Sequence, residues 1–210
     1  MSDIVLYDYW RSSASYRVRI ALNLKRLDYR AVSVNLVEGE QTGEDYKAHN
    51  PQGRVPALIV DGATLTQSLS ILDYLDDTRP EPPFLPPDPA AAAHVRAMAQ
   101  VVATDIHPLN NLAVLRYLKN TFGVDDAAKD RWYAHWVREG FTGLEALAKR
   151  HGGKHLSGDR PGLADICLVP QIYNARRFDI TLDDFPKLVE YDAKANALDA
   201  FRKAHPDNNK

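Results

Sequence analysis

The first residues able to do chemistry form a short polar turn, Arg11-Ser12-Ser13-Ala14-Ser15, directly before a helix-like segment. A helix that begins here points free backbone N–H groups and the positive end of its dipole at whatever lies above the turn. A serine hydroxyl in such a place can donate a hydrogen bond to a thiolate, which lowers the pKa of a bound thiol. The alternative is that Ser12, Ser13 and Ser15 only cap the helix.

Two further places favour a peptide-like ligand. Val55-Pro56 stands at the start of a predicted strand, where proline cannot donate to the ladder and indicates an edge, a bulge or a cis bond. A cis bond would turn the Val55 backbone outward, although most X–Pro bonds are trans. Gln67-Ser68 opens the next helix, and such a helix start suits a carboxylate, with simple capping as the alternative.

The composition argues against several other kinds of site. The formal net charge is −2, so nothing indicates a nucleic-acid-binding surface. The single cysteine, Cys167, excludes an intrachain disulfide and a cysteine-cluster metal site, and its apolar helix predicts an inert core residue. His151 and His155 lie in a Gly-Gly loop, which favours a solvated loop over a metal site. We expect no bound metal.

The expected location is cytoplasmic. Met1-Ser2-Asp3 lacks the basic start and long apolar run of a signal peptide. No apolar stretch approaches the roughly 20 residues needed to cross a bilayer, so we expect no membrane partner. One cysteine in the chain fits a reducing compartment.

A small α/β domain has to position the two helix starts and the Val55 backbone. Its predicted elements are a strand at 4–7, a helix at 16–27, strands at 29–36, 55–60 and 63–66, and a helix from 68. The first strand, helix and second strand form a βαβ unit with a parallel pair. Asp61-Gly62 is a strong hairpin turn between the last two strands. The order is therefore βαβ followed by ββα.

The second half of the chain is predicted to be entirely helical. Six prolines between Arg79 and Pro89 cannot continue a helix and make a stiff connector. We therefore expect an α/β domain at 1–80, a linker at 81–89 and an all-α domain at 90–210. The predicted helices of the second domain are 90–118, 127–151, 163–177 and 185–204.

The chain resembles the cytosolic glutathione transferases over essentially its whole length. These proteins join a thioredoxin-like domain to a helical bundle through a proline-rich linker. The resemblance is closest to the zeta class, which includes maleylacetoacetate and maleylpyruvate isomerases. The segments that carry it are Trp10–Ser13, Arg17–Leu22, Asn50-Pro51, Val55-Pro56, Gln67–Leu72, Asp105–Asn111, Ala164–Gln171 and Asn174–Phe178.

The resemblance implies glutathione as cofactor and assigns residues to it. Ser13 would face the glutathione sulfur, with Ser12 beside it. Val55 would pair through its main chain with the cysteinyl backbone of glutathione. Gln67 and Ser68 would hold the γ-glutamyl carboxylate and amine.

Three more residues receive roles from the resemblance. Gln41 would contact the glycyl end of glutathione. His107 and Asn110 would approach glutathione from the neighbouring subunit, which implies a homodimer.

The chain departs from the family pattern in two places. Many members follow the paired serines with a cysteine, but this chain has Ala14, which excludes a redox role there and leaves isomerisation intact. The family's capping serine or threonine before Asp165 is Gly162 here. Glycine is tolerated at a helix N-cap, and we interpret Gly162 and Asp165 as structural.

The implied activity is cis–trans isomerisation of a small diketo acid with two carboxylates. The glutathione thiolate would add to the cis double bond, the resulting single bond would rotate, and loss of glutathione would leave the trans product. Arginine suits the carboxylates, because its planar fork binds them bidentately and stays charged. Arg11 is the first candidate and Arg177 the second, with Arg176 as a weaker substrate-binding candidate.

Several alternatives stay open. Within the resemblance, Ala14, Trp10-Arg11 and Asp105–Pro108 are more similar to the maleylpyruvate type, whereas Leu112-Ala113 replaces arginines that this type can carry. We favour conversion of maleylacetoacetate to fumarylacetoacetate, in catabolism of aromatic compounds or tyrosine. A general transferase that conjugates electrophiles would not need two arginines. A non-enzymatic binding protein is disfavoured, because the thiol-activating serines are present.

Overall fold

The computed structural model describes residues 4–210, and its contacts divide the chain into two compact units. The first contains the chain up to Pro83 together with Ala197–Lys210, and the second contains Phe84–Asn196. The C-terminal segment thus packs with the first unit, although it follows the helical unit in the sequence. The domain ranges expected from the sequence, 1–80 and 90–210, stay a prediction, and they do not include this return of the chain.

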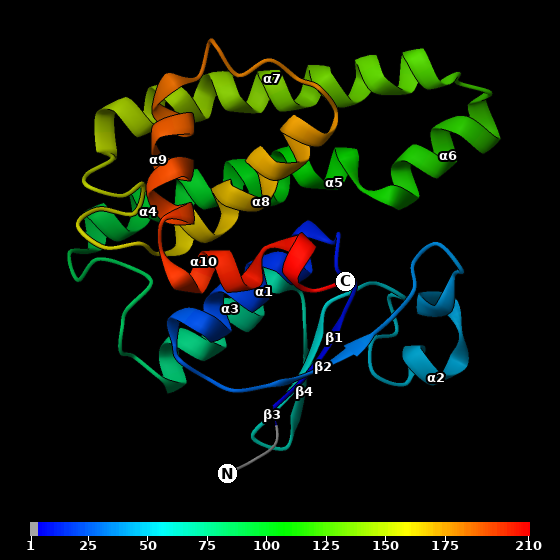
Figure 1. Ribbon diagram of the computed structural model, residues 1–210, viewed down its shortest axis with the longest axis horizontal. Coiled ribbons are helices and arrows are strands. Elements are labelled where there is room, and N and C mark those ends of the chain that lie inside the picture. Colours follow the sequence, from blue (N-terminus) through cyan, green and yellow to red (C-terminus); the bar gives the residue numbers. More distant parts are fainter. Residues whose placement is uncertain (1–3) are drawn as a thin grey trace. The chain divides into compact units, whose positions relative to one another are not determined.

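Four short strands form the sheet of the first unit, in the order β2-β1-β3-β4 (Figure 1). They are β1 (Val5–Asp8), β2 (Arg30–Ser33), β3 (Ala57–Val60) and β4 (Ala63–Thr66). Strands β1 and β2 are parallel, with Leu6 opposite Ala31. Strand β3 is antiparallel to both β1 and β4. The predicted order, βαβ followed by ββα, is confirmed.

The hairpin between β3 and β4 turns at the two residues that the sequence indicated. Asp61 has a φ of 52° and Gly62 a φ of 79°. Two positive φ angles in a two-residue loop match the right-handed twist of the flanking strands. Glycine and aspartate tolerate this region, which explains why this dipeptide marks the turn.

Three helices lie together on one side of this sheet (Figure 1). They are α1 (Ser13–Leu24), α3 (Ser68–Thr78) and α10 (Asp199–Ala204), and the 3-10 turn η3 (Pro206–Asn208) follows α10. Their apolar faces and the inner face of the sheet form a fully buried core of Leu6, Val18, Leu22, Leu58, Ile71 and Leu72. This burial is the main stabilising contribution to the unit.

A second, smaller cluster lies beneath the segment between β2 and β3. That segment contains a 3-10 turn η1 (Glu40–Thr42) and the one-turn helix α2 (Glu44–Lys47). Buried Val34, Tyr46, Val55 and Ala57 pack together there, with Tyr7, Tyr9 and Leu36 against them. The cluster connects the Val55 loop to the sheet.

The second unit is helical throughout, as predicted. Its helices are α4 (Pro89–Gln100), the π-helix η2 (Val101–Ile106), α5 (His107–Asn110), α6 (Leu112–Phe122), α7 (Asp126–His151), α8 (Leu163–Arg177) and α9 (Pro186–Asn196). Helices α4, α7, α8 and α9 pack on one another. Phe141, Leu144, Ile166, Leu168 and Leu188 are fully buried between them.

The predicted continuous helix over 90–118 was wrong. After α4 the chain forms the π-helix η2, and Pro108 in the first turn of α5 has no N–H with which to continue the hydrogen bonds of the preceding helix. Asn111 is extended, with φ −73° and ψ 160°, and its side chain accepts hydrogen bonds from the Ala113 and Val114 amides. A new helix, α6, therefore starts at Leu112 and runs beyond the predicted end at 118.

The predicted helix over 185–204 is also interrupted. Leu198 is extended, with φ −88° and ψ 139°, and separates α9 from α10. Helix α9 belongs to the second unit and α10 to the first. The interruption is what lets the chain return to the α/β unit.

Glycine is required at position 162 by close packing and is not merely tolerated at the N-cap of α8. A Cβ added there would lie 2.2 Å from the Phe84 carbonyl oxygen, which also accepts a 2.9 Å hydrogen bond from the Leu163 amide. Asp165 is fully buried, and its carboxylate accepts hydrogen bonds from the amides of Leu156, Ser157 and Gly162. Burial raises the pKa of Asp165, although these hydrogen bonds oppose the shift. Gly162 and Asp165 therefore both stabilise the N-terminus of α8.

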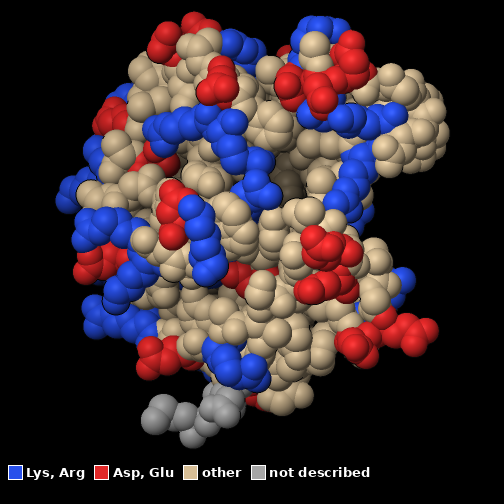
Figure 2. All heavy atoms as spheres, turned by 45° about the vertical axis from the view of Figure 1, so that its right-hand side comes forward, with Lys and Arg blue, Asp and Glu red and all other residues tan. Residues whose placement is uncertain are grey.

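The charges are mixed on the face of the molecule in Figure 2. Lysine and arginine alternate there with aspartate and glutamate, and neither sign forms one continuous field. No helix among residues 4–210 is long and apolar enough to span a membrane.

Candidate active site

The two neighbouring serines in the turn between β1 and α1 have different surroundings. The Ser12 side chain caps α1, because its Oγ accepts a 3.2 Å hydrogen bond from the Ser15 amide. Ser13 is the first residue of the helix, is buried, and takes no part in this cap. The capping alternative therefore accounts for Ser12, whereas the Ser13 hydroxyl stays a candidate hydrogen-bond donor to a bound thiolate.

Arg11 is held in place by the aromatic residues before it. Its Nη2 donates a 3.0 Å hydrogen bond to the Tyr9 hydroxyl, and its guanidinium lies 4.8 Å from the Trp10 ring centroid. The side chain is half-buried. A guanidinium fixed in this way loses less conformational entropy when it binds a carboxylate. Tyr9 was not among the site residues expected from the sequence.

Hydrogen bonds to its main chain hold the Val55 loop in place. The Val55–Pro56 bond is cis, one of the outcomes that the proline position indicated. The preceding Arg54 carbonyl accepts hydrogen bonds from the Tyr46 hydroxyl at 2.6 Å and from Asn50 Nδ2 at 2.5 Å. The Val55 side chain is buried, and strand pairing begins only at Ala57. The main chain at Val55 thus precedes the ladder.

The turn between β4 and α3 carries backbone strain. Gln67 has φ 66° and ψ 117°, a conformation that costs a non-glycine residue about 1–3 kcal/mol. Its side chain does not cap α3, so the first amides of that helix have no side-chain acceptor from the N-cap residue. Such a helix start is suited to a carboxylate.

A buried arginine supports the same turn. Arg17 is only 2% exposed, and its Nη1 donates a 3.2 Å hydrogen bond to Ser68 Oγ. A guanidinium at this place adds positive potential beside the α3 N-terminus. Arg17 was not predicted as a site residue from the sequence, because its helical position resembles that of a core residue.

The segments that carry Gln41 and Gln67 are linked through one short loop. Gln67 Nε2 donates a 2.7 Å hydrogen bond to Gln52 Oε1. A Cβ at the neighbouring Gly53, whose φ is 61°, would lie 2.9 Å from the Gln41 carbonyl oxygen. Gln41 is 9% exposed, and its Oε1 has no hydrogen-bond partner. A buried amide oxygen of this kind is costly unless a ligand or water satisfies it.

In the second unit, Arg177 belongs to an aromatic and polar cluster. Its guanidinium lies 4.7 Å from the Phe178 ring centroid, and Phe178 stacks on Tyr133 at 3.8 Å. Arg177 and Gln171 oppose a rise in the pKa of the Tyr133 phenol. Burial nevertheless raises the pKa of Tyr133 to about 12, so it stays a neutral donor.

Arg176 has a different environment from its neighbour. Its Nη1 forms a 2.6 Å ion pair with Asp192 of α9, whose side chain is 3% exposed. Breaking this pair would remove a cation from a buried carboxylate, which also accepts a 2.8 Å hydrogen bond from Asn196 Nδ2. The ion pair makes Arg176 a structural link between α8 and α9 and weakens its candidacy for the substrate.

Asn110 approaches the Tyr133 cluster from the short helix α5. Its Nδ2 donates a 3.2 Å hydrogen bond to the Tyr133 carbonyl, whereas its buried Oδ1 has no partner. His107 is the first residue of the same helix and is half-buried. Asn110, Tyr133 and Arg177 thus form one neighbourhood within the second unit, and Tyr133 was not anticipated from the sequence.

Family models match both halves of the chain. Residues 11–78 match the glutathione S-transferase N-terminal domain, and residues 127–204 match the C-terminal domain of the same family. The first range contains the β1–α1 turn from Arg11 onward and the Val55 and Gln67 segments. The second contains Tyr133 and Arg177.

Curated relatives align over nearly the whole chain. A probable maleylacetoacetate isomerase from Vibrio cholerae is 47% identical, with 99% of this chain and 98% of the relative covered. A maleylacetoacetate isomerase from Rhizobium meliloti is also 47% identical, covering 100% and 99%. A maleylpyruvate isomerase from Ralstonia is 45% identical over 96% of both chains.

Solved structures agree with these relatives. A holo maleylpyruvate isomerase, described as a bacterial zeta-class glutathione S-transferase, has a TM-score of 0.95 and is 44% identical over 97% of both chains. A maleylacetoacetate isomerase from Methylobacterium extorquens, solved with malonate and GSH bound, has a TM-score of 0.94 and is 40% identical over 97% of both chains. From domains, relatives and structures together, this chain belongs to the glutathione S-transferase family and to its zeta class, the class of maleylacetoacetate and maleylpyruvate isomerases.

Proposed function

We propose that this protein is a glutathione-dependent cis–trans isomerase that converts maleylacetoacetate to fumarylacetoacetate in the catabolism of aromatic compounds or tyrosine. The observation that carries the proposal is the β1–α1 turn. It places a buried serine at a helix N-terminus two residues from a guanidinium that Tyr9 and Trp10 hold. Full-length relatives with this activity support it.

The first unit offers groups that fit each part of glutathione. The α3 N-terminus without a side-chain cap, Ser68 and Gln67 suit the γ-glutamyl carboxylate and amine. The main chain of Val55 suits the cysteinyl peptide group, and the unpartnered Oε1 of Gln41 suits a donor at the glycyl end. We propose that these residues hold glutathione.

When bound, glutathione supplies a thiolate, a nucleophile toward a double bond conjugated with a carbonyl. The protein's part is to stabilise that charge. A hydrogen bond from Ser13, together with the α1 amides and dipole, favours the charged form of a thiol and lowers its pKa. Ser12 keeps the helix start in place through its bond to the Ser15 amide.

The substrate carboxylates require cations, and we propose Arg11 and Arg177 for this role. A guanidinium can bind a carboxylate bidentately and supplies a positive charge. The Tyr9 hydroxyl orients Arg11, and the rings of Phe178 and Tyr133 support Arg177. Arg176 is the weaker candidate, because it pairs with Asp192.

Maleylpyruvate is the second candidate substrate. A maleylpyruvate isomerase structure matches with a TM-score of 0.95, and the Ralstonia maleylpyruvate isomerase is 45% identical. Against it stand Leu112 and Ala113 at the start of α6, where this type can carry arginines. The two substrates differ by a short chain extension, so relative kcat/KM decides between them.

We also propose that the protein is a cytoplasmic homodimer in which His107 and Asn110 approach the glutathione of the neighbouring subunit. A groove of about 450 Å³ in the second unit supports an interface; Val101, Thr104, Asp105, Pro108, Leu109, Trp136, Glu139, Gly140 and Gly143 line it. The adjacent α6 leaves Leu112, Tyr117 and Phe122 exposed. Exposed apolar surface of this kind marks association. The single buried Cys167 fits a reducing compartment.

The experiment compares isomerisation with conjugation. Purified protein is assayed with glutathione and maleylacetoacetate, maleylpyruvate or 1-chloro-2,4-dinitrobenzene. We expect the highest kcat/KM with maleylacetoacetate, and a loss of about 100-fold in Arg11→Ala for both diacids but not for the neutral electrophile. A higher kcat/KM with maleylpyruvate would select the second candidate. Conjugation alone would identify a general transferase.

A further inference from the structure

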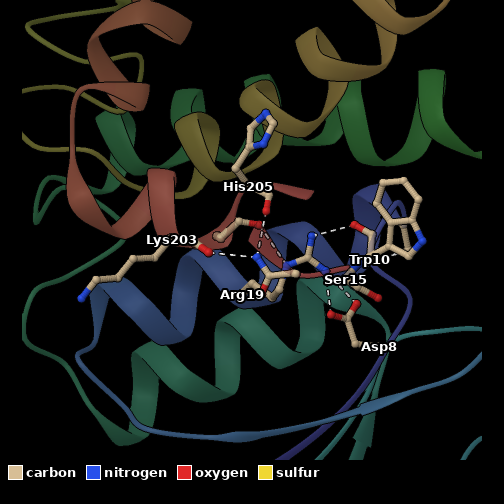
Figure 3. Close-up of polar contacts among 9 residues, drawn as sticks. Asp8, Trp10, Ser15, Arg19, Lys203 and His205 are labelled. Carbon is tan, nitrogen blue, oxygen red and sulfur yellow. Dashed lines mark hydrogen bonds and ion pairs between the residues drawn. The ribbon is translucent and has the colours of Figure 1, made fainter. Parts of the chain in front are cut away.

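Arg19 of α1 is a fully buried charge to which the proposed mechanism gives no role. It is 0% exposed and lies at the centre of Figure 3. Its Nη1 donates to both Asp8 carboxylate oxygens, at 2.8 and 2.7 Å. Removing a guanidinium from water is costly, so full burial requires that its donors be satisfied.

The other donors of Arg19 reach two separate backbone carbonyls. Its Nη2 donates to the Trp10 carbonyl at 3.0 Å, and its Nε donates to the Ala204 carbonyl at 3.0 Å. Asp8 ends β1, Trp10 lies in the turn before α1, and Ala204 ends α10. One side chain thus joins the sheet, the candidate thiol turn and the C-terminal segment of the first unit. Figure 3 shows it between Asp8 and Trp10 on one side and the segment of Lys203 and His205 on the other.

These contacts fix the main chain on both sides of Tyr9. The Tyr9 carbonyl accepts a 2.8 Å hydrogen bond from the Ser12 amide, and its hydroxyl accepts from Arg11. The positions of Arg11, Ser12 and Ser13 therefore follow from where Asp8 and Trp10 are held. The C-terminal segment reaches the same turn again, because the Lys210 ammonium lies 5.2 Å from the Trp10 ring centroid.

We propose that Arg19 is a positioning residue of the active site: by holding the Trp10 carbonyl against Asp8 and α10, it sets the geometry in which Ser13 and Arg11 work. The proposal rests on the proposed function of the β1–α1 turn. Small displacements of such a turn change catalysis strongly, because donors must meet the developing charge at hydrogen-bond distance. It also gives the returning C-terminal segment a role in catalysis.

The same unit contains a second buried cation, Lys25, that is a matched control for an effect on stability alone. The Lys25 side chain is fully buried, and its Nζ donates to Asp76 Oδ1 at 2.6 Å and to the Pro82 carbonyl at 2.7 Å. Like Arg19, it joins α1 to a carboxylate and a distant carbonyl. It follows the last residue of α1, Leu24, at the end opposite the turn. Loss of Lys25 therefore perturbs stability without touching the turn.

Two measurements on Arg19→Lys, Asp8→Asn and Lys25→Met test the proposal. The first is hydrogen exchange without glutathione, which follows the Ser12, Ser15 and Tyr16 amides. The second is the pH titration of ultraviolet thiolate absorbance in the glutathione complex. Arg19→Lys keeps a positive charge but lacks the planar fork that serves three acceptors at once. Asp8→Asn keeps Arg19 itself, so it serves if the lysine variant does not fold.

We expect faster exchange at the turn amides and a thiol pKa raised by about half a unit or more in Arg19→Lys and Asp8→Asn. Lys25→Met should leave both readouts at their wild-type values. An unchanged thiol pKa and unchanged turn exchange in folded Arg19 and Asp8 variants would overturn the proposal. A wild-type complex whose thiol pKa is not lowered would contradict the proposed function instead, and the exchange data alone would then decide whether Arg19 holds the turn.

Discussion

Ser12 and Ser13 are neighbours, but their hydroxyls meet different surroundings. Ser12 Oγ accepts from the Ser15 amide and is occupied by the helix cap, whereas Ser13 begins the helix outside that cap. The sequence indicated both serines and left capping and thiol binding open for each. Only the register of the helix separates them, because α1 begins at Ser13 and not at the predicted Tyr16.

This difference predicts opposite behaviour of two alanine variants. Ser12→Ala should lower the free energy of unfolding by about 1 kcal/mol, since it removes an N-cap. Ser13→Ala should keep the stability but lower kcat about 100-fold, since it removes a donor to the thiolate. Denaturant unfolding and steady-state kinetics of both variants check this. Equal effects of the two substitutions on kcat would contradict the assignment.

Tyr133 was not expected from the sequence as a site residue, because an aromatic residue at helical spacing is predicted to be part of the hydrophobic core. The structure places its phenol near Gln171 and Arg177 and stacks its ring on Phe178. Arg177 itself was indicated by the family motif, but its support comes from α7, more than 40 positions earlier in the chain. Such a pairing depends on helix packing and leaves no local pattern.

The raised pKa of Tyr133 predicts a pH dependence of stability. Burial raises this pKa from 10.0 to about 12, so between these values the folded protein binds a proton that the unfolded chain has lost. The stabilisation is complete below pH 10 and is lost as the pH rises through 12, by up to about 3 kcal/mol. Denaturant unfolding at pH 9 and pH 11.5 measures this loss. The Tyr133→Phe variant should lose less over the same interval, and an equal loss would contradict the assignment.

At the scale of elements, strands and capped helices could be predicted, whereas interruptions could not. Residues 90–118 have a continuous helical pattern, but the π-helix η2 and α5 divide it. Gly140 of α7 lets η2 pack closely against that helix, since a Cβ at this position would lie 2.3 Å from Ile106 Cγ1. The requirement comes from close packing between two helices, which a hydrophobic period does not encode.

The start of α9 depends on a carboxylate from another helix. Glu145 of α7 is 4% exposed and accepts hydrogen bonds from the Lys187 and Leu188 amides, each at 3.1 Å. Glu145→Ala should lower the free energy of unfolding by about 2 kcal/mol, because two buried amides lose their acceptor. Glu190→Ala, which removes an exposed carboxylate paired with two lysines, is the control and should change stability little. Comparable losses in both variants would show that burial of the Glu145 bonds contributes nothing.

At the scale of the whole molecule, the alternation of elements and the family motifs sufficed to predict the α/β and helical parts. The return of the C-terminal segment did not follow, because the Arg19–Ala204 contact joins residues 185 positions apart. The proposed dimer belongs to this scale too. Gly143 lines the groove of the second unit, and a Cβ there would meet nothing within 4 Å.

Gly143→Arg should therefore separate the proposed dimer without unfolding the chain. A long side chain fits the isolated unit, but it would fill the groove and so prevent a second copy from covering it. Light scattering should give twice the chain mass of 23.5 kDa for wild type and for Gly143→Ala, and the single mass for Gly143→Arg. A wild-type mass of 23.5 kDa would contradict the dimer.

In the proposed reaction glutathione acts as a cofactor and is not consumed. The most direct measurement follows maleylacetoacetate by NMR with glutathione at about one hundredth of the substrate concentration. We predict complete conversion to the trans isomer, full recovery of free glutathione, and no conversion in Arg177→Ala at the same concentration. Product that stops at one equivalent of glutathione, or a stable glutathione adduct in place of the trans isomer, would contradict this role of glutathione.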